Sequence, residues 1–182
     1  MPDALERVSR DASRYNGFNL LAAQWHRDAS RASMWILASR GDARPQAIAP
    51  GIHALSNASL DTPWPKVDRA ARAMQDALRR DVNAAMNAGL NAAADRDDLC
   101  KRLFALLGNP EIARDDALPQ TGIALDVERA LSAAFIRMPS YGTRSSTVLM
   151  VDRKGDALFI ERRCEPDAPI EESRFEFHAA EP

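Results

Sequence analysis

The chain has 182 residues, of which 46% are hydrophobic and 27% charged, and its 24 basic and 26 acidic residues give a net charge of -2. These values are those of ordinary globular proteins, and they exclude an intrinsically disordered chain. The charges are interspersed, so they form no basic face for nucleic acid. No segment has the eighteen or so consecutive apolar residues of a membrane span. The first ten residues lack the apolar core of a signal peptide. We therefore expect a cytoplasmic protein with one domain, residues 1–182.

The first third of the chain predicts a short helix followed by three strands. Apolar residues spaced at three and four predict a helix within residues 3–13. Compact apolar runs predict a buried strand at 18–23 and a second strand at 34–38, and the polar segment 26–31 between them is short enough for an antiparallel hairpin. A third strand is expected at Ile52–Ser56.

Three helices are expected in the middle of the chain. Thr62 before Pro63 is typical of a helix N-cap with proline in the first turn, and the residues that follow predict a long amphipathic helix lying on the sheet. Asp95 is expected to cap a second helix. Asp126 is expected to cap a third, which Pro139 stops.

The last part of the chain predicts further strands. The β-prone runs at 147–151 and 157–160 flank the sequence Asp-Arg-Lys-Gly-Asp at 152–156, which is typical of a hairpin turn. Phe175 and Phe177 alternate with charged residues, a pattern that predicts an edge strand.

Four strings of sequence, in this order, carry a resemblance to a known family. They are YNGFNLLAA at 15–23, PGIHALSNASLDTPWPKV at 50–67, YGTRSSTVLMVD at 141–152, and the Glu161-Arg162 pair after a strand. Any one of them alone is a weak signal. In combination they resemble the transport and Golgi organisation 2 family, also called the NRDE family.

The resemblance implies a fold and a catalytic group. The implied fold is α+β, a partial N-terminal-nucleophile hydrolase-like arrangement of stacked antiparallel sheets with flanking helices. Family members usually begin with Met then Cys, the candidate nucleophile, and carry an Asn-Arg-Asp-Glu motif near the start. Because residue 2 is Pro2 and the first family string begins at Tyr15, we expect the domain to be N-terminally incomplete and this chain to be inactive.

Three functions are left open at this point, so whether the protein is an enzyme is open too. In the first, the full-length protein acts on small carbon-nitrogen (amide) bonds. In the second, it is a non-catalytic protein that handles haem or acyl-lipid cargo. In the third, the chain is a truncated product without a function of its own. We expect a small-molecule ligand or substrate as partner, no nucleic acid and no cofactor, and the oligomeric state is open.

The second family string holds three candidate site residues. By analogy with related amidases, Asn57 can donate a hydrogen bond to a developing oxyanion, although Asn at a strand end also satisfies backbone groups in an Asx-type turn. Asp61 and Trp64 are candidate substrate-binding residues. The structural alternatives are that Asp61 caps backbone groups before the helix and that Trp64 packs in the core or at its rim.

The third family string places one guanidinium among hydroxyl groups before a strand. Arg144, Ser145 and Ser146 are therefore candidate substrate-binding residues for a carboxylate or phosphate. The alternative is that Arg144 pairs with a buried acid while the hydroxyl groups cap the strand entrance.

The cysteines and histidines give weaker signals. Cys100 beside leucines is expected to be a buried small hydrophobe, whereas Cys164 follows two arginines that can lower the pKa of its thiol. The spacing of His26, His53 and His178 matches neither a metal site nor a catalytic triad. We therefore predict no metal site.

Overall fold

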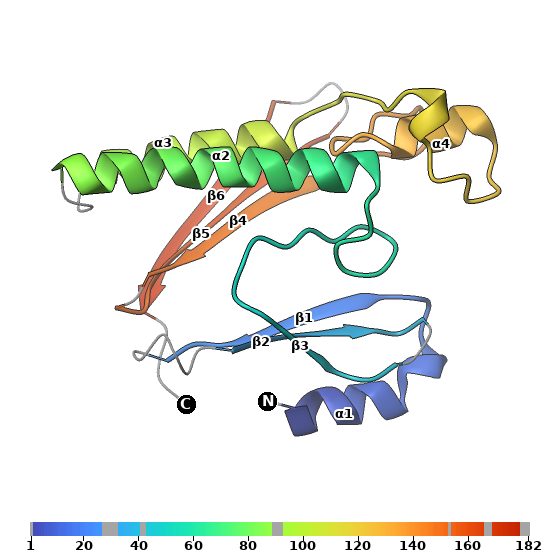
Figure 1. The fold of residues 1–182 in the computed structure, drawn as a ribbon, viewed down its shortest axis with the longest axis horizontal. Helices are drawn as coiled ribbons and strands as arrows, with labels where there is room; N and C mark the ends of the chain where they lie inside the picture. The colour runs from blue at the N-terminus through green and yellow to red at the C-terminus, as the bar shows by residue number, and fades with distance from the viewer. Residues whose placement is uncertain are drawn as a thin grey trace. The chain divides into compact units, whose positions relative to one another are not determined.

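The computed structural model describes residues 2–26, 33–40, 43–88, 93–152, 154–165 and 169–178. Within these ranges the chain forms four α-helices and two antiparallel sheets of three strands each, which confirms the expected α+β class (Figure 1). The N-terminal-nucleophile arrangement stays a prediction.

The chain divides into two compact units. The first contains Met1–Gly51, Met150–Leu158 and Glu176–Pro182, and the second contains Ile52–Leu149 and Phe159–Phe175. Within the part of the chain that the structure describes, no helix is both long enough and apolar enough to cross a membrane.

The first unit contains the sheet with strand order β1-β2-β3. Strands β1 (Asn19–Gln24) and β2 (Ser33–Ala38) pair antiparallel with Leu20 opposite Leu37, which confirms the predicted pair. Leu37 on the central strand is 0% exposed, and helix α1 (Pro2–Arg10) contacts this strand. Part of the connecting segment 26–31 lies outside the described residues.

Helix α1 (Pro2–Arg10) matches the helix predicted within residues 3–13. It contacts β2 and buries Leu5. The hydroxyl group of Ser9 donates a hydrogen bond to the carbonyl group of Ala43, on the segment that follows β2. The short 3-10 helix η1 (Ala12–Arg14) then leads the chain toward β1.

Two expectations about the first strands are wrong. The run at 18–23 forms the edge strand β1, which is not buried: Leu20 is 36% and Leu21 49% exposed. The third strand is β3 (Gln46–Ile48), which pairs antiparallel with β2, and not Ile52–Ser56. The latter segment is a loop because the peptide groups of Ala54 bond to Asp61 and not to a neighbouring strand.

In the second unit, helix α2 (Pro65–Ala88) is the predicted long helix, but it begins later than expected. Proline in the first position of a helix loses no intrahelical hydrogen bond, so Pro65 fits the start. Thr62 is not the N-cap. Its hydroxyl group donates to the carbonyl group of Ser59 at 2.8 Å, in the turn before the helix.

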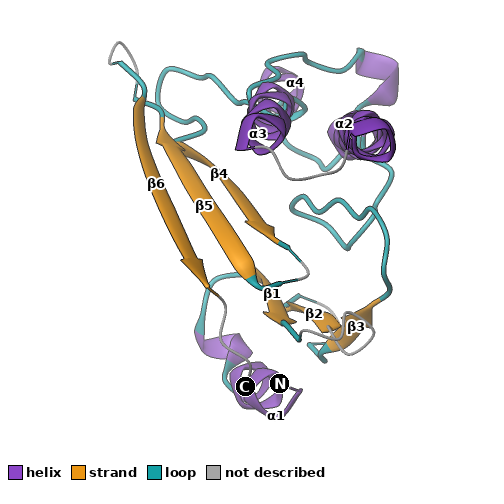
Figure 2. Ribbon diagram, turned by 90° about the vertical axis from the view of Figure 1, so that its left-hand side faces the viewer, coloured by secondary structure: helices purple, strands orange, loops and turns teal. Residues whose placement is uncertain are grey.

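Helix α3 (Ala93–Leu107) packs against α2 (Figures 1 and 2). It buries Cys100 and Phe104, and it ends before Gly108 as predicted. Asp95 lies inside the helix, so the prediction that it is the N-cap is wrong.

Helix α4 (Leu125–Leu131) follows a loop that contains the short 3-10 helix η2 (Asp115–Ala117). Asp126 is its second residue, so it is not the N-cap, and the helix ends well before Pro139. The early end has a local cause. The hydroxyl group of Ser132 donates to the carbonyl group of Arg129 at 2.6 Å and takes the place of a continuing helical hydrogen bond.

The second sheet has the strand order β4-β5-β6. Between β4 (Ser145–Val151) and β5 (Asp156–Arg163), the carboxylate of Asp152 accepts hydrogen bonds from the peptide N–H groups of Lys154 and Asp156, at 2.8 and 2.9 Å. Asp152 also donates its own N–H to the carbonyl group of Asp156 at 3.0 Å. These contacts confirm the predicted hairpin.

Strand β6 (Glu171–His178) is exposed along its whole length and ends the sheet, which confirms the predicted edge strand. Within the second unit, α3 lies on one face of this sheet (Figure 2). Arg174 pairs with Asp97 of α3 at 3.0 Å, and the guanidinium group of Arg162 lies 3.9 Å from the ring centre of Phe104. The edge strand and the central strand are thus both tied to α3.

Candidate functional site

The loop of residues 52–64, in the second unit, is closed by the side chain of Asp61. Its Oδ1 accepts a hydrogen bond from the peptide N–H of Ala54 at 2.8 Å, and its Oδ2 lies 2.6 Å from Nδ1 of His53. The peptide N–H of Asp61 donates to the carbonyl group of Ala54 at 2.8 Å. Three contacts therefore hold the two ends of segment 53–61 together.

The closure also sets the charge state of the loop. The pKa of Asp61 is lowered, first by the hydrogen bond with His53 and then by the one from the Ala54 N–H. The carboxylate is therefore ionised at neutral pH, and it accepts a hydrogen bond from His53 when Nδ1 carries the proton. Asp61 has a positive φ of 56°, a conformation that few residues other than glycine adopt.

Asn57 and Trp64 lie on the same loop as Asp61. Asn57 is exposed in the bend that Asp61 closes, and its side-chain amide makes no hydrogen bond within the described part of the chain. Trp64 is half-buried at the entrance of α2, where its carbonyl group accepts a hydrogen bond from the N–H of Asp68 at 3.0 Å. The structure thus places these three candidates on one short segment.

The other three candidates lie at the start of β4. Arg144 is 74% exposed and lies 3.8 Å from Glu165, which is 2.6 Å from Arg163. Ser145 is exposed and Ser146 half-buried on the strand. Two guanidinium groups therefore share one carboxylate, and the described residues of this cluster carry an excess positive charge.

Neither cysteine forms a disulfide. Burial raises the pKa of the Cys100 thiol, which keeps it protonated and unreactive. Cys164 is half-buried directly after β5, and its peptide N–H donates to the carbonyl group of Arg144 at 2.8 Å. Among the residues with a described position, no group of three or more His, Cys, Asp or Glu side chains is suited to hold a metal ion.

Two residues of the second family string have contacts that we did not predict from the sequence. His53 is paired with Asp61, and the only sequence signal for that pair is an acidic residue eight positions further on. Lys66 donates from Nζ to the carbonyl group of Leu131 at 2.8 Å, which caps the C-terminal end of α4. Burial lowers the pKa of Lys66.

The described surface has two grooves that could hold a ligand, one in each unit. In the first unit, a groove of about 740 Å³ is lined by side chains that include Val8, Tyr15 and Phe18. The rings of Tyr15 and Phe18 meet edge to face, with 6.4 Å between their centres. In the second unit, a groove of about 310 Å³ is lined by α4 and the segments on either side of it.

The chain is similar to proteins from three mammals. A protein from Bos taurus named "Transport and Golgi organization protein 2 homolog" is 35% identical over 161 residues, which is 87% of this chain and 54% of that protein. The Homo sapiens protein of the same name is 34% identical over 164 residues, and the Mus musculus "Transport and Golgi organization 2 homolog" is 30% identical over 161, with the same coverage.

The chain spans about half the length of these relatives, 54% in each case. The family model described as "Transport and Golgi organisation 2" matches residues 2–166, so it includes both clusters of candidate residues and both grooves. This chain therefore belongs to the transport and Golgi organisation 2 family.

Proposed function

We propose that this chain supplies the oxyanion-binding part of a family member that hydrolyses a small carbon-nitrogen (amide) bond with an N-terminal-nucleophile arrangement. In this proposal a cysteine thiolate outside the 52–64 loop attacks the amide carbonyl group. The carbon-nitrogen bond then breaks, the amine leaves with a proton, and water hydrolyses the thioester to a carboxylic acid.

One observation carries this proposal: the hydrogen bonds that fix the loop do not involve the side chain of Asn57. Asp61 closes the loop through Ala54 and His53. The Asn57 side chain is exposed, and no described residue engages its amide. An amide donor that is carried on a fixed loop and has spare hydrogen-bonding capacity suits an oxyanion that appears only in the transition state. Asp61 acts as a positioning residue in this proposal.

The cluster at the start of β4 supports a role in binding an acidic part of the substrate. Arg144 and Arg163 share the single carboxylate of Glu165, so one positive charge is available for a ligand carboxylate or phosphate. Ser145 and Ser146 are adjacent in sequence and can add hydroxyl donors. Trp64 is proposed to contribute an apolar surface to the same substrate.

The test is amine release from a panel of N-acyl amides, measured with a fluorogenic amine reagent. The assay compares residues 1–182 with the longer protein encoded if an in-frame Met-Cys start lies upstream in the gene. We expect turnover by the longer protein, loss of turnover when its second residue is changed from Cys to Ala, and none with residues 1–182. Absence of turnover across the panel by the longer protein contradicts the proposal.

A second function, binding of haem or acyl-lipid cargo, is favoured by the groove of the first unit. Its apolar side chains include Val8, Tyr15 and Phe18, and the adjoining strand β1 leaves Leu20 and Leu21 exposed. Titration with haem is the test. A saturable absorbance shift without amide turnover favours cargo binding, and an unsaturable shift contradicts it.

A further inference from the structure

The groove of about 310 Å³ in the second unit combines apolar walls with charged side chains. Ile112, Ala130 and Phe135 provide the apolar surface, and Asp126, Arg129 and Arg137 provide the charges. Ile112 is 55% exposed, so a ligand that covers it gains apolar contact. Neither the amide hydrolysis nor the cargo binding proposed above uses this groove.

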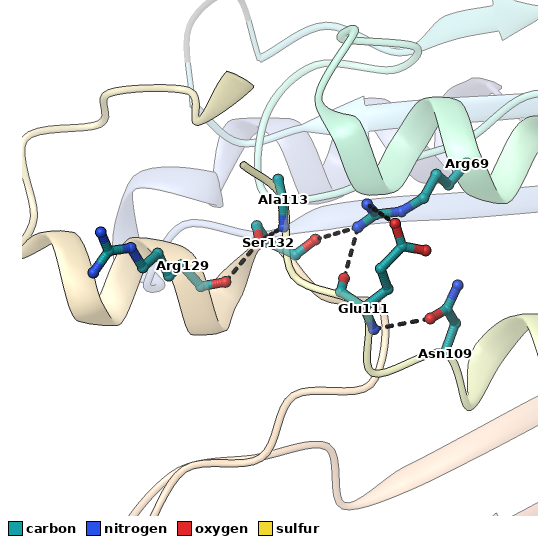
Figure 3. A network of polar contacts seen from close by, with 6 residues as sticks. All are labelled: Arg69, Asn109, Glu111, Ala113, Arg129 and Ser132. Atoms are coloured by element: carbon teal, nitrogen blue, oxygen red, sulfur yellow. Dashed lines mark hydrogen bonds and ion pairs between the residues drawn. The ribbon is translucent and has the colours of Figure 1, made fainter. Parts of the chain in front are cut away.

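Hydrogen bonds donated by peptide N–H groups join the two walls of this groove. The peptide N–H of Phe135 donates to the carbonyl group of Asn109 at 2.9 Å. The peptide N–H of Ala113 donates to the buried hydroxyl group of Ser132 at 2.7 Å (Figure 3). The segment before η2 is thereby fixed to the chain after α4.

Arg69 of α2 adds a third tie between the same walls. Its guanidinium group donates to the carbonyl groups of Glu111 and Ser132, at 2.7 and 3.2 Å, and pairs with the Glu111 carboxylate at 3.2 Å (Figure 3). These contacts are all made within the chain, so the two walls are held in place by the protein's own hydrogen bonds. A preformed groove costs less conformational entropy on binding than one that must assemble.

Residues of the third family string hold the backbone that carries two groove residues, Phe135 and Arg137. Thr143 donates its N–H to the carbonyl group of Ile136 at 2.9 Å and accepts the Ile136 N–H on its hydroxyl group at 2.9 Å. Gly142 and Arg137 form an isolated antiparallel β-bridge, and a Cβ on Gly142 would lie 2.8 Å from the carbonyl oxygen of Ile136. This close approach requires glycine, and it holds the backbone that carries Phe135 and Arg137.

The two arginines of the groove differ in their partners. Arg129 is occupied, because its guanidinium group makes two short contacts with the Asp115 carboxylate and the charge of Asp126 raises its pKa further. Arg137 lies over the ring of Phe135, 5.1 Å from its centre, and forms no ion pair with any acidic residue whose position is described. Arg137 is therefore the cation that a ligand can use.

We propose that this groove binds a small monocarboxylate with an apolar or aromatic body, with its carboxylate on Arg137 and its body against Ile112 and Phe135. Arginine offers the planar fork of donors that matches a carboxylate. The aromatic ring beneath the guanidinium group orients that fork. The site is separate from the Asn57 loop, so it does not depend on amide hydrolysis.

The test is isothermal titration of residues 1–182 with phenylacetate, phenylacetamide and inorganic phosphate. Phenylacetamide has the same body without the charge, and phosphate has the charge without the body. We expect saturable binding of phenylacetate, with each of the other probes at least about tenfold weaker, because a charged hydrogen-bonded contact and the apolar contact are each removed in turn. Equal affinity for phenylacetamide, or no saturable binding of phenylacetate, overturns the proposal.

Two variants locate the site. Arg137→Gln should weaken phenylacetate binding by about tenfold to a hundredfold. Arg72→Gln removes the same charge from an exposed arginine of α2 and should leave the affinity unchanged. Equal loss in both variants, or no loss in Arg137→Gln, contradicts a site at Arg137. If Arg137→Gln fails to fold, the comparison of the three probes on the unmodified chain still tests whether the chain prefers a monocarboxylate with an apolar body.

Discussion

Replacing Ser132 by alanine tests whether one buried hydroxyl group holds the segments around α4 together. Ser132 is 5% exposed, and its Oγ accepts the N–H of Ala113 at 2.7 Å. In Ser132→Ala this buried N–H loses its partner, whereas the Arg129 carbonyl group still accepts the N–H of residue 132 at 3.1 Å. One unsatisfied buried donor costs about 1–3 kcal/mol of the free energy of unfolding.

Differential scanning calorimetry measures the consequence. In a protein of this size each kcal/mol lowers Tm by roughly 2–4 °C, so we expect Ser132→Ala to lower Tm by about 2–12 °C. Thr62→Ala is the matched control, because its hydroxyl group also donates to a carbonyl group but at the surface, and a change of about 0.5 kcal/mol or less is expected. A Tm for Ser132→Ala equal to that of the control refutes the reasoning.

Three further predictions concern single residues. The Asp61 carboxyl group should titrate below its ordinary pKa of 3.8. Its stabilising contact with His53 is then complete above about pH 4 and is lost as the pH falls through the lowered pKa. Carboxyl-carbon NMR titration measures this pKa, and a value at or above 3.8 contradicts the prediction. Gly142→Ala should destabilise the chain by about 1–3 kcal/mol in urea unfolding, since the added Cβ would lie 2.8 Å from the Ile136 oxygen, and an unchanged midpoint contradicts it. Leu158→Ala should lower the free energy of unfolding by about 2–5 kcal/mol in the same measurement, because Leu158 is 1% exposed. A loss below about 1 kcal/mol, which is typical of a surface substitution, contradicts this prediction.

Local chemistry explains which elements could be predicted from the sequence. The hairpin at Asp152–Asp156 could be predicted because the aspartate that makes the turn bonds to peptide groups only a few residues away. The long helices could be predicted from apolar spacing, but their first residues could not. Pro65 took the first helical position in place of the predicted cap at Thr62, and Asp95 and Asp126 lie inside helices that begin earlier.

Features that depend on contacts between distant residues could not be predicted. The segment 52–56 has the composition of a strand, yet the peptide N–H and carbonyl groups of Ala54 are engaged by Asp61. The pairing of His53 follows from the same loop closure. The groove beside α4 depends on the hydrogen bond between Ala113 and Ser132, which are 19 residues apart. The family strings located candidate residues without indicating the contacts that hold them.

The most direct test of the proposed oxyanion role is the rate of amine release by the longer protein with Asn57→Ala, compared with Ser59→Ala in the same loop. Ser59 is exposed beside Asn57 and serves as the control. We predict that loss of the Asn57 amide lowers kcat by about 10²–10³-fold with little change in KM, and that Ser59→Ala retains the rate. Equal kcat values for the two variants would contradict the assignment of Asn57.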